Sequence, residues 1–596
     1  MPRRYRVAAI QFEPELGAKE RNRERLLALC TEAVRAGARL VVTPEMATTG
    51  YCWYDRAEIA PFVEPVPGPT TERFAALARE HACYLVVGLP EVDPRTGIFY
   101  NSAALIGPGG VLGVYRKTHS FISEPKWAKD GDHGLPVWET ELGRLGILIC
   151  MDADYFEPAR LLALQGADVL CFPTNWLLEK GPGASWMARA LENGCYLIAA
   201  DRYGCERGVQ FSGGSAIIAP DGTIQCRLDT GDGVVLGEVD LEPARADRSR
   251  LFGARRPEFY DTLTLNAYLW NPLEFHGLYG HRPLPPGRRS RVAVVQLQPL
   301  PGSLADNVAR IDESLATLPR SVRLVVLPEY ALTGVPHDAS AAERLAVPLT
   351  DDLVATLRRL ARRHRTLLAV GVLERLTAGC ASTVLLVAPD GLLAHYRKVH
   401  VIGHERAFLL PGDAGPPVVD LPLGRVGVLA GTDLLFPEIV RVLALAGCDL
   451  IVAPAGPLLP PVRGLGPTAV PLPSPAVTGE DPTHFHLARV RAFENMTYVA
   501  YAALPEPDGT GWSGLFGPVP ETRASEQLVE PRSTGLAWGV VDTTNLATRY
   551  PTNPVRAKDL LRMRRTDLYD LLQISPAASP LTITAGVVGG ASGRAE

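Results

Sequence analysis

An internal repeat constrains the fold of this chain more than any other feature of its sequence. Five motifs occur twice in the same order, and the second copies lie about 280 to 310 residues further along the chain. The pairs are residues 7–14 and 292–299, 40–50 and 324–334, 115–119 and 396–400, 189–193 and 491–495, and 255–261 and 564–570. Chance similarity does not keep five motifs in order over such a length, so the chain contains two copies of one fold.

The repeat also predicts the domain boundaries. We expect a first domain over residues 1–280, a linker over 281–290 and a second domain over 291–575. The linker is rich in proline and charge, which disfavour regular structure. Residues 457–482, rich in Pro and Gly, predict an insertion loop in the second domain. The Ala-, Gly- and Ser-rich residues 576–596 predict a disordered tail.

Composition narrows the class of protein. The chain is 46% hydrophobic and 21% charged, with a formal net charge of −5, as is typical of a globular protein. This balance does not favour nucleic acid or an anionic membrane as a partner. No apolar run approaches the ~20 residues that span a bilayer, and the run at residues 7–10 is too short for a signal peptide. We therefore expect a cytoplasmic protein.

The ten cysteines do not form a recognisable framework. Eight precede residue 230, and there is no Cys-x-x-Cys pair. This spacing is typical neither of a zinc site nor of a secreted disulfide scaffold. We expect most of these cysteines to be reduced and buried.

Strand and helix patterns alternate in each half. Short runs rich in β-branched residues at 85–88, 146–150 and 167–172 predict buried strands. The patterns at 23–35 and 71–81 predict helices between them. This alternation indicates a layered α/β fold rather than an all-β one.

Three residues that could perform chemistry each follow a predicted strand: Glu45, Lys117 and Cys150. The carboxyl ends of strands are where function collects in open α/β sheets, so we expect the three to converge. A cysteine nucleophile needs a base to form the thiolate and a positive group to stabilise the oxyanion that follows. A buried Glu45 can be the base, and Lys117 with the backbone N–H of Met151 can stabilise the oxyanion.

These motifs resemble those of the nitrilase superfamily of carbon–nitrogen hydrolases, over nearly the whole of both halves. Residues 150–160 (CMDADYFEPAR) are similar to the family's Cys-Tyr-Asp-x-x-Phe-Pro-Glu-x-x-Arg segment and depart from it at Met151 and Phe156. The resemblance implies an αββα four-layer sandwich in each half. It also implies that Glu124 corresponds to the second glutamate that many members place beside the triad.

The resemblance implies a mechanism as well. Glu45 takes the thiol proton, Cys150 attacks a carbonyl or nitrile carbon, and Lys117 stabilises the tetrahedral intermediate. Ammonia or an amine departs, and Glu45-activated water hydrolyses the resulting thioester. No metal or organic cofactor is needed. A lone cysteine at a strand end is usually a core residue, and only the surrounding motifs single out Cys150.

Other residues near these motifs have two interpretations each. Tyr51, Trp53 and Tyr54 follow Glu45 closely and form either an aromatic wall of the substrate pocket or core contacts. Asn175 and Trp176 follow a strand and either line the pocket or pack.

Four polar residues, in contrast, are interpreted as structural. Arg189, Glu192 and Asn193 share a helical segment that recurs in the second copy, and we expect them to hold that helix and its contacts. His119 is interpreted as a structural histidine.

The second copy lacks the nucleophile. Residues 427–441 align with the Cys150 segment without a gap, and Gly431 occupies the nucleophile position, which excludes covalent catalysis there. Glu329, Lys398 and Glu405 are retained. They either support the fold as a buried ion pair or bind an acyl or amide ligand without turning it over, and we favour the first interpretation.

The substrate class follows only from a weak signal. True nitrilases of the superfamily typically carry Cys-Trp-Glu, whereas amidase and carbamoylase branches more often carry Cys-Tyr-Asp. Residues 150–152, Cys-Met-Asp, are nearer the second group, so we expect a small amide or N-carbamoyl substrate. A nitrile substrate and acyl transfer to an amine are the alternatives within the same chemistry. A non-enzymatic scaffold is disfavoured because the first half retains every catalytic residue type.

Members of the superfamily commonly pair through one face as two-fold dimers. We therefore expect the two halves of this chain to pair with each other as an internal pseudo-dimer, with the second half supporting the first. The insertion 457–482 would then reach over a pocket. A further homo-oligomer stays open, because closed assemblies and filaments both occur among superfamily members.

Overall fold

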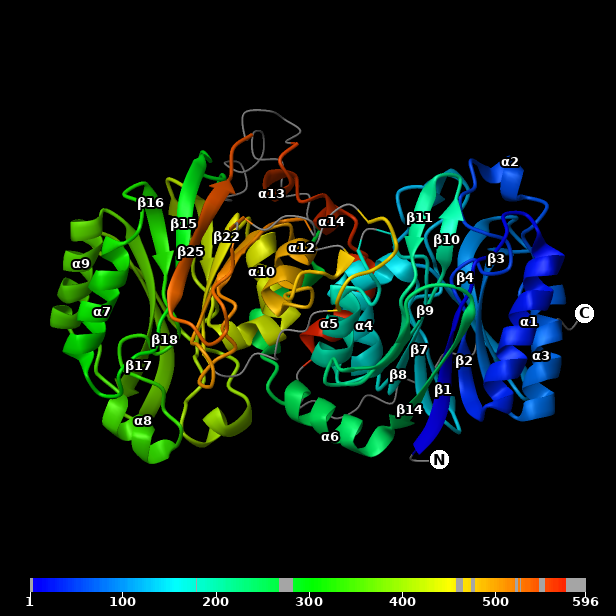
Figure 1. The fold of residues 1–596 in the computed structure, drawn as a ribbon, viewed down its shortest axis with the longest axis horizontal. Coiled ribbons are helices and arrows are strands. Elements are labelled where there is room, and N and C mark those ends of the chain that lie inside the picture. Colours follow the sequence, from blue (N-terminus) through cyan, green and yellow to red (C-terminus); the bar gives the residue numbers. More distant parts are fainter. Residues whose placement is uncertain are drawn as a thin grey trace, which may run out of the picture.

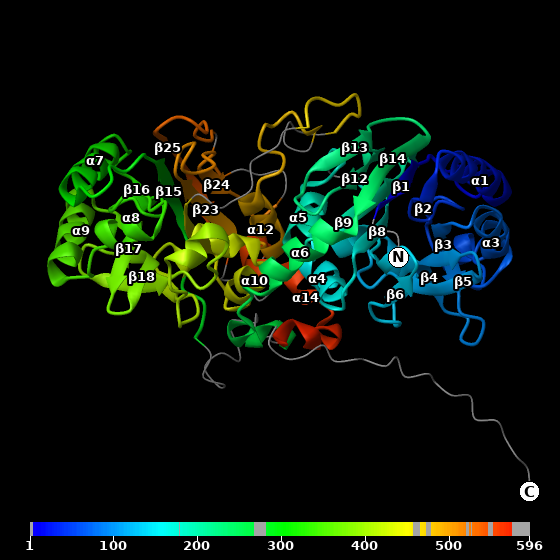
Figure 2. The same ribbon diagram turned by 90° about the horizontal axis from the view of Figure 1, so that it is seen from below.

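Two α/β halves lie side by side in this chain (Figure 1). The computed structural model describes residues 4–177, 179–266, 282–456, 465–472, 478–519, 524–525, 527–545 and 552–574. In each half two β-sheets pack face to face, and helices cover the outer face of each sheet (Figures 1 and 2). The fold is therefore two αββα sandwiches, as the resemblance to the nitrilase superfamily implies.

The first half contains two six-stranded sheets. The strand order of one is β14 (Gly233–Asp240), β1 (Arg4–Gln11), β2 (Ala38–Val42), β3 (Tyr84–Val92), β4 (Phe99–Gly107), β5 (Gly110–Arg116). The order of the other is β13 (Ile224–Leu228), β12 (Ser215–Ile218), β9 (Tyr196–Asp201), β8 (Val169–Thr174), β7 (Gly143–Ile147), β6 (Val137–Thr140). Helices α1 (Lys19–Arg35) and α3 (Pro69–His81) cover the first sheet, and α4 (Phe156–Leu164) and α5 (Ala184–Asn193) cover the second. The hairpin β10 (Tyr203–Glu206) and β11 (Val209–Ser212), α2 (Arg56–Ile59) and α6 (Leu241–Phe252) complete this half.

The second half repeats this arrangement. One sheet has the order β19 (Leu392–Arg397), β18 (Gly379–Val387), β17 (Leu367–Leu376), β16 (Val322–Val326), β15 (Arg289–Gln296), β25 (Gly535–Asp542). The other is β20 (Val418–Leu421), β21 (Gly424–Val428), β22 (Leu450–Ala455), β23 (Tyr498–Ala503), β24 (Gly514–Phe516). The covering helices are α7 (Leu304–Ala316), α9 (Asp351–His364), α10 (Pro437–Leu445) and α12 (Leu487–Asn495). Helices α8 (Ala339–Leu345), α13 (Pro554–Ala557) and α14 (Asp559–Arg562) are short.

Local sequence explains why these segments form these elements. Strand β1 is covered on both faces, so its residues from Val7 to Ile10 are all fully buried and form a continuous apolar run. Helix α3 begins with Pro69 after Gly68, and it ends where Ala82 adopts the left-handed conformation with φ 50°. The predicted strands at 85–88 and 167–172 and the predicted helices are confirmed. The strand predicted at 146–150 is β7, which ends at Ile147, before Cys150.

The two halves meet through the helices α4 and α5 of the first and α10 and α12 of the second (Figure 1). At the centre, four fully buried charged residues form a closed ring of ion pairs: Arg189, Glu192, Arg491 and Glu494. Arg491 lies 2.6 Å from both Glu192 and Glu494, and Arg189 pairs with the same two carboxylates. Arg189 and Glu192 contact each other within α5, as expected, and each also pairs with a residue of α12 in the second half.

Two further ion-pair groups flank this ring in a pseudo-symmetric manner. Glu438 accepts a hydrogen bond from Arg255 at 2.9 Å and forms an ion pair with Arg160 at 3.0 Å, both in the first half. Glu157 accepts a hydrogen bond from Arg564 at 3.0 Å and forms an ion pair with Arg441 at 3.4 Å, both in the second half. All six side chains are buried, so formation of the interface takes charged groups of both halves out of water.

Each half also extends an arm over the other. Residues 255–264 and 564–573 lie side by side below the interface, where Figure 2 shows them in green and red. Arg256 donates to the backbone oxygens of Val399 and Gly412 in the second half, and Arg565 donates to those of Thr118 and Gly131 in the first. The motif repeated near the end of each copy is therefore an interdomain contact.

The structure can be compared with only part of the predicted linker, insertion and tail. Strand β15 begins at Arg289, inside the predicted linker, and the described linker residues 282–288 contain no helix or strand. The predicted tail 576–596 lies outside the described residues, as do residues 457–464 and 473–477 of the predicted insertion. Of the insertion's described residues, 465–472 reach across to the first half beside β13 (Figure 2). In the described part of the chain, no helix combines the length and hydropathy that a membrane crossing requires.

We expect the substitution Glu494→Gln to destabilise the protein strongly. It removes one negative charge from the buried ring and leaves Arg189 and Arg491 with a single carboxylate between them. Breaking a buried ion pair by removing one partner costs roughly 3–5 kcal/mol. Urea unfolding monitored by circular dichroism measures this loss. Glu238→Gln is the matched control, because the Arg6–Glu238 pair is exposed and spans 3.9 Å, and an equal effect of both substitutions would contradict the role of the ring.

We also expect the first half expressed alone (residues 1–280) to form a homodimer. Arg189 and Glu192 occupy the same positions in their motif as Arg491 and Glu494, so a second copy can close an equivalent ring. Analytical ultracentrifugation reports the mass. A stable monomer with the activity of the full chain would show that the second half is dispensable.

Candidate active site

Glu45, Lys117 and Cys150 follow β2, β5 and β7 at the ends of the two packed sheets of the first half. The loop after β2 lies so close to β3 that a side chain on Gly88 would come within 2.2 Å of the Pro44 carbonyl oxygen. Gly371 has the same place in the second half, 2.5 Å from the Glu329 Cα. Because these glycines have no side chain, the loop that carries the glutamate can pack directly against the neighbouring strand in both copies.

The polar side chains at this point form one buried cluster. Lys117 Nζ lies 2.8 Å from Glu45 Oε1 and 2.5 Å from Glu124 Oε1. Asn101 Nδ2 donates to the same Glu45 oxygen at 2.7 Å, and the Tyr51 hydroxyl donates to Glu124 at 2.7 Å. Within the described residues, the second carboxylate oxygens of Glu45 and Glu124 have no hydrogen-bond partner. They are therefore left to interact with a ligand or water.

Burial and mutual charge set the protonation of this cluster. Burial raises the pKa of Glu124 to about 7, with Lys117 acting against it and Glu45 adding to it. Burial alone would lower the pKa of Lys117, but Glu124 and Glu45 raise it well above its ordinary value, so Lys117 stays an ammonium. Burial and Glu45 raise the pKa of Cys150 well above that of a free thiol, and Lys117 opposes them. At rest the cysteine is therefore a thiol that needs a base.

A tight turn presents the cysteine. Cys150 opens the 3-10 helix η2 (Cys150–Asp154) with φ +44°, a conformation that non-glycine residues rarely adopt. The buried carboxylate of Asp152 holds the turn by accepting from the backbone N–H of Ile149 and of His119 and from the Tyr115 hydroxyl. His119 also approaches this carboxylate through Nδ1, at 3.0 Å, which agrees with its interpretation as structural. Such strain at a single residue is typical of functional turns.

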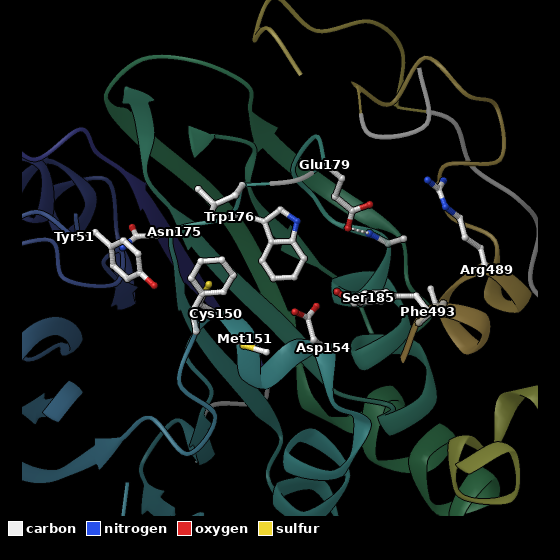
Figure 3. A pocket seen from close by; sticks show the side chains of 14 residues that line it. Tyr51, Cys150, Met151, Asp154, Asn175, Trp176, Glu179, Ser185, Arg489 and Phe493 are labelled. Carbon is white, nitrogen blue, oxygen red and sulfur yellow. Dashed lines mark hydrogen bonds between the residues drawn. The ribbon is translucent and has the colours of Figure 1, made fainter. Parts of the chain in front are cut away.

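Cys150 borders a pocket that both halves enclose (Figure 3). Its lining from the first half includes Tyr51, Cys150, Met151, Asp154, Asn175, Trp176, Glu179 and Ser185. From the second half, Arg489, Val490 and Phe493 of α12 form the opposite wall. The pocket would therefore be incomplete in an isolated first half.

Not every residue expected at the pocket lies there. Tyr51, Asn175 and Trp176 line it, and Met151 does so beside the cysteine. The Trp53 indole instead donates to the Gly50 carbonyl and packs on a phenylalanine, and the Tyr54 side chain is 66% exposed. Trp53 and Tyr54 are therefore not pocket residues. They share one loop with Tyr51, and sequence proximity could not separate the three.

Two groups of functional residues were missed from the sequence. Asn101 is a polar position in the apolar strand β4, and the equivalent position in the second half is Ser382, which also contacts the glutamate there. A polar residue at the same strand position in both copies could have identified Asn101 from the sequence. The lining by Arg489 and Phe493 had no local signal, because it depends on how the halves pack.

The second half keeps the ionic cluster. Lys398 Nζ lies 2.6 Å from both Glu329 and Glu405, and the Tyr330 hydroxyl donates to Glu405 at 2.8 Å. This arrangement reproduces the cluster around Lys117.

The place of the nucleophile in the second half is filled. A side chain on Gly431 would lie 2.5 Å from the Ala455 Cβ, at the end of β22, and Gly431 does not have the positive φ of Cys150. One on the neighbouring Gly456 would lie 2.7 Å from Glu329 Oε2. This geometry favours a structural role for Glu329, Lys398 and Glu405 over ligand binding.

One lysine ties the pocket loop to the second half. Lys180 Nζ is buried and donates to the backbone oxygens of Leu465, Gly466 and Pro467, at 3.4, 3.3 and 2.8 Å. The described part of the insertion thus holds the loop that carries Glu179. Across the described ranges, no group of three or more His, Cys, Asp or Glu residues is placed to hold a metal ion.

Comparisons with known proteins agree with the repeat. The family model "Carbon-nitrogen hydrolase" matches residues 6–249 and 291–515. A nitrilase of Pyrococcus abyssi is 37% identical over 261 residues, which cover 43% of this chain and 98% of that protein. Omega-amidase NIT2 of Xenopus tropicalis is 31% identical over 255 residues, which cover 40% of this chain and 90% of that protein. One half of this chain thus corresponds to a whole relative.

Among solved structures, a carbon-nitrogen hydrolase from Helicobacter pylori G27 is similar over 44% of this chain and 98% of that chain, with 25% identity and a TM-score of 0.40. The two family matches together span most of the sequence. The chain therefore belongs to the carbon-nitrogen hydrolase family, is a hydrolase, and carries the family's domain twice in tandem.

Proposed function

We propose that the first half hydrolyses the C–N bond of a small amide or N-carbamoyl compound through a thioester on Cys150. One observation carries this proposal: the buried cluster of Glu45, Lys117 and Glu124 interacts electrostatically with the strained Cys150, which lines a pocket. A base, a cation and a nucleophile are the groups that acyl transfer to a thiol needs.

The first chemical step forms the thioester. Glu45 accepts the proton of the Cys150 thiol, and the sulfur attacks the carbonyl carbon of the substrate. The oxyanion that forms receives hydrogen bonds from the Lys117 ammonium and the backbone N–H of Met151. When the C–N bond breaks, Glu45 returns its proton to the nitrogen, which leaves as ammonia or an amine.

The second step releases the acid. Glu45, again a carboxylate, takes a proton from water, and the hydroxide attacks the thioester carbonyl. The sulfur leaves and regains the proton, so that the enzyme returns to its starting state. Glu124 acts as a positioning residue, because its carboxylate holds the Lys117 ammonium at 2.5 Å and does not need to exchange a proton itself.

Nitrile hydrolysis is the second candidate. The relative named nitrilase supports it, and the relative named omega-amidase supports an amide substrate. The Cys-Met-Asp segment favours amides, but the Asp152 carboxylate is engaged with Ile149, His119 and Tyr115 and does not line the pocket. We infer that this segment reports on the family branch rather than on a direct substrate contact.

The second half takes no chemical part in this proposal. It supplies α12 to the pocket wall and the ring partners of Arg189, whose Nε donates to the Ala153 carbonyl within the nucleophile turn. We propose that its function is to complete and rigidify the site of the first half.

We expect Cys150→Ala to abolish hydrolysis of every substrate class that the wild type accepts. Cys150 carries the only thiol among the described residues that line the pocket, so activity of the variant should fall by at least roughly a thousandfold. The measurement is acid and ammonia release from a panel of small amides, N-carbamoyl compounds and nitriles. Intact-mass spectrometry of the quenched wild type should show an acyl adduct that is absent from the variant.

Cys205→Ala is the matched control for this substitution, because Cys205 is exposed and lies outside the pocket lining. It should retain both turnover and adduct. Turnover by Cys150→Ala at the wild-type rate would refute the thioester. Product formed only when an amine acceptor is added would identify an acyltransferase instead.

We expect Gly431→Cys not to create a second reactive site. Its Cβ would overlap with Ala455, so the variant should lose stability by about 1–3 kcal/mol and gain no second acyl adduct. Thermal unfolding and intact-mass spectrometry test both points. Gly391→Cys is the control, because a side chain there meets open space. A second adduct on a stable Gly431→Cys protein would mean that the second half still binds substrate.

A further inference from the structure

The pocket contains two carboxylates that the proposed mechanism does not use. Asp154 ends the 3-10 helix that Cys150 begins, and Glu179 belongs to the loop before α5. Figure 3 shows both side chains, with Ser185, on the side of Cys150 that faces α12, whereas Tyr51 and Asn175 lie on the other side. The pocket therefore has an acidic end beyond the reacting sulfur.

Asp154 is the less engaged of the two carboxylates. It makes no hydrogen bond or ion pair with any residue in the described part of the chain, although it lines the pocket. Burial and the neighbouring Glu179 raise the pKa of Asp154 to about 7, while Arg189 and Lys117 act against them. A carboxylate in this condition gains most from a cation that enters the pocket.

Glu179 is fixed rather than free. Its Oε1 accepts from the backbone N–H of Ala184 at the start of α5, at 3.0 Å, and its Oε2 lies 3.8 Å from His484 Nε2 of the second half. The charge is thereby held in place beside Asp154. The loop that carries it is itself held by Lys180 on the insertion.

Two buried polar side chains at the pocket point independently to a ligand. Ser185 is 4% exposed and its hydroxyl has no hydrogen-bond partner among the described residues. Asn175 is 2% exposed, and both polar atoms of its amide lack partners within the same residues. Both line the pocket, and unpaired buried polar groups are costly unless something binds them.

Aromatic side chains complete an environment suited to a cation. Figure 3 shows the Trp176 indole between Cys150 and Glu179. Phe493 closes the same end from α12. Ammonium and guanidinium groups bind favourably over aromatic faces.

The positive charge of Arg489 does not reverse the negative charge of the pocket end formed by Asp154 and Glu179. Its Nη1 donates to the backbone oxygen of His484, which binds the guanidinium within its own half. Figure 3 shows the guanidinium pointing away from Asp154.

We propose that this pocket selects substrates that carry an ammonium or guanidinium group remote from the scissile carbonyl, with Asp154 as its principal partner and Glu179 and Ser185 beside it. The inference rests on the proposed function, since it takes Cys150 as the reacting end of the pocket. It names a specificity residue, Asp154, that lies one helical turn from the nucleophile.

Binding to an inactive protein tests the selection separately from catalysis. Full-length Cys150→Ala protein is titrated calorimetrically with 4-aminobutanamide, 5-aminopentanamide and 6-aminohexanamide, and with their neutral counterparts pentanamide, hexanamide and heptanamide. We expect at least one amino amide to bind about tenfold more tightly than its counterpart, as a buried charged hydrogen bond provides. If no amino amide binds more tightly than its counterpart, the inference is wrong.

Substitutions in the same protein then locate the effect. Adding Asp154→Asn should lower the ratio of cationic to neutral affinity about tenfold, and Ser185→Ala should lower it severalfold. Glu72→Gln, on the exposed face of α3, is the control and should leave the ratio unchanged. An unchanged ratio in both pocket variants would overturn the assignment.

Turnover by the wild type separates this inference from the proposed function. Preferential binding of an amino amide without any hydrolysis of the panel would refute the proposed hydrolysis and leave the cation site standing. Hydrolysis of all three amino amides with the same kcat/KM as their neutral counterparts would support the hydrolysis and overturn the selection.

Discussion

The ring of Arg189, Glu192, Arg491 and Glu494 is the interaction on which the rest of this structure depends. Four buried charges are stable only when each is paired with an opposite charge. Separation of the two halves would break the ion pairs between them and leave these side chains exposed or without a partner. The ring is also connected to the chemistry, because Arg189 donates to the carbonyl of Ala153, inside the turn that presents Cys150. The association of the two halves is thus coupled to the geometry of the turn that begins at Cys150.

This coupling explains what the second half has kept and what it has lost. It retains the ion-pair positions, the arm that packs on the first half and the cluster around Lys398. At Gly431 the 3-10 turn persists without the positive φ, and the end of β22 occupies the space of a side chain. Packing constraints act on the whole domain, whereas the constraint to hold a thiol in a strained conformation applies only where a cysteine is present.

Much of this arrangement was predictable from the sequence, because repeats and strand patterns are local signals. The two sandwiches, the strands before Glu45 and Lys117 and the loss of the nucleophile at Gly431 all follow from motifs read along the chain. The location of Trp53 outside the pocket did not follow, since three aromatic residues in one loop share the same pattern. The wall formed by α12 was equally hidden, because contacts between halves depend on packing geometry and leave no periodicity.

The covalent fusion of the halves has a consequence for how such a site can evolve. In a homodimer both protomers have the same sequence, so a residue of one protomer that lines the pocket of the other is present in both. Any substitution at that position therefore changes both pockets. Here Arg489 and Phe493 have separate counterparts, Met187 and Leu191, in the first copy. Each side of the interface can therefore mutate alone, and a single substitution in the second copy can change the lining of the pocket beside Cys150 without a change in the first copy.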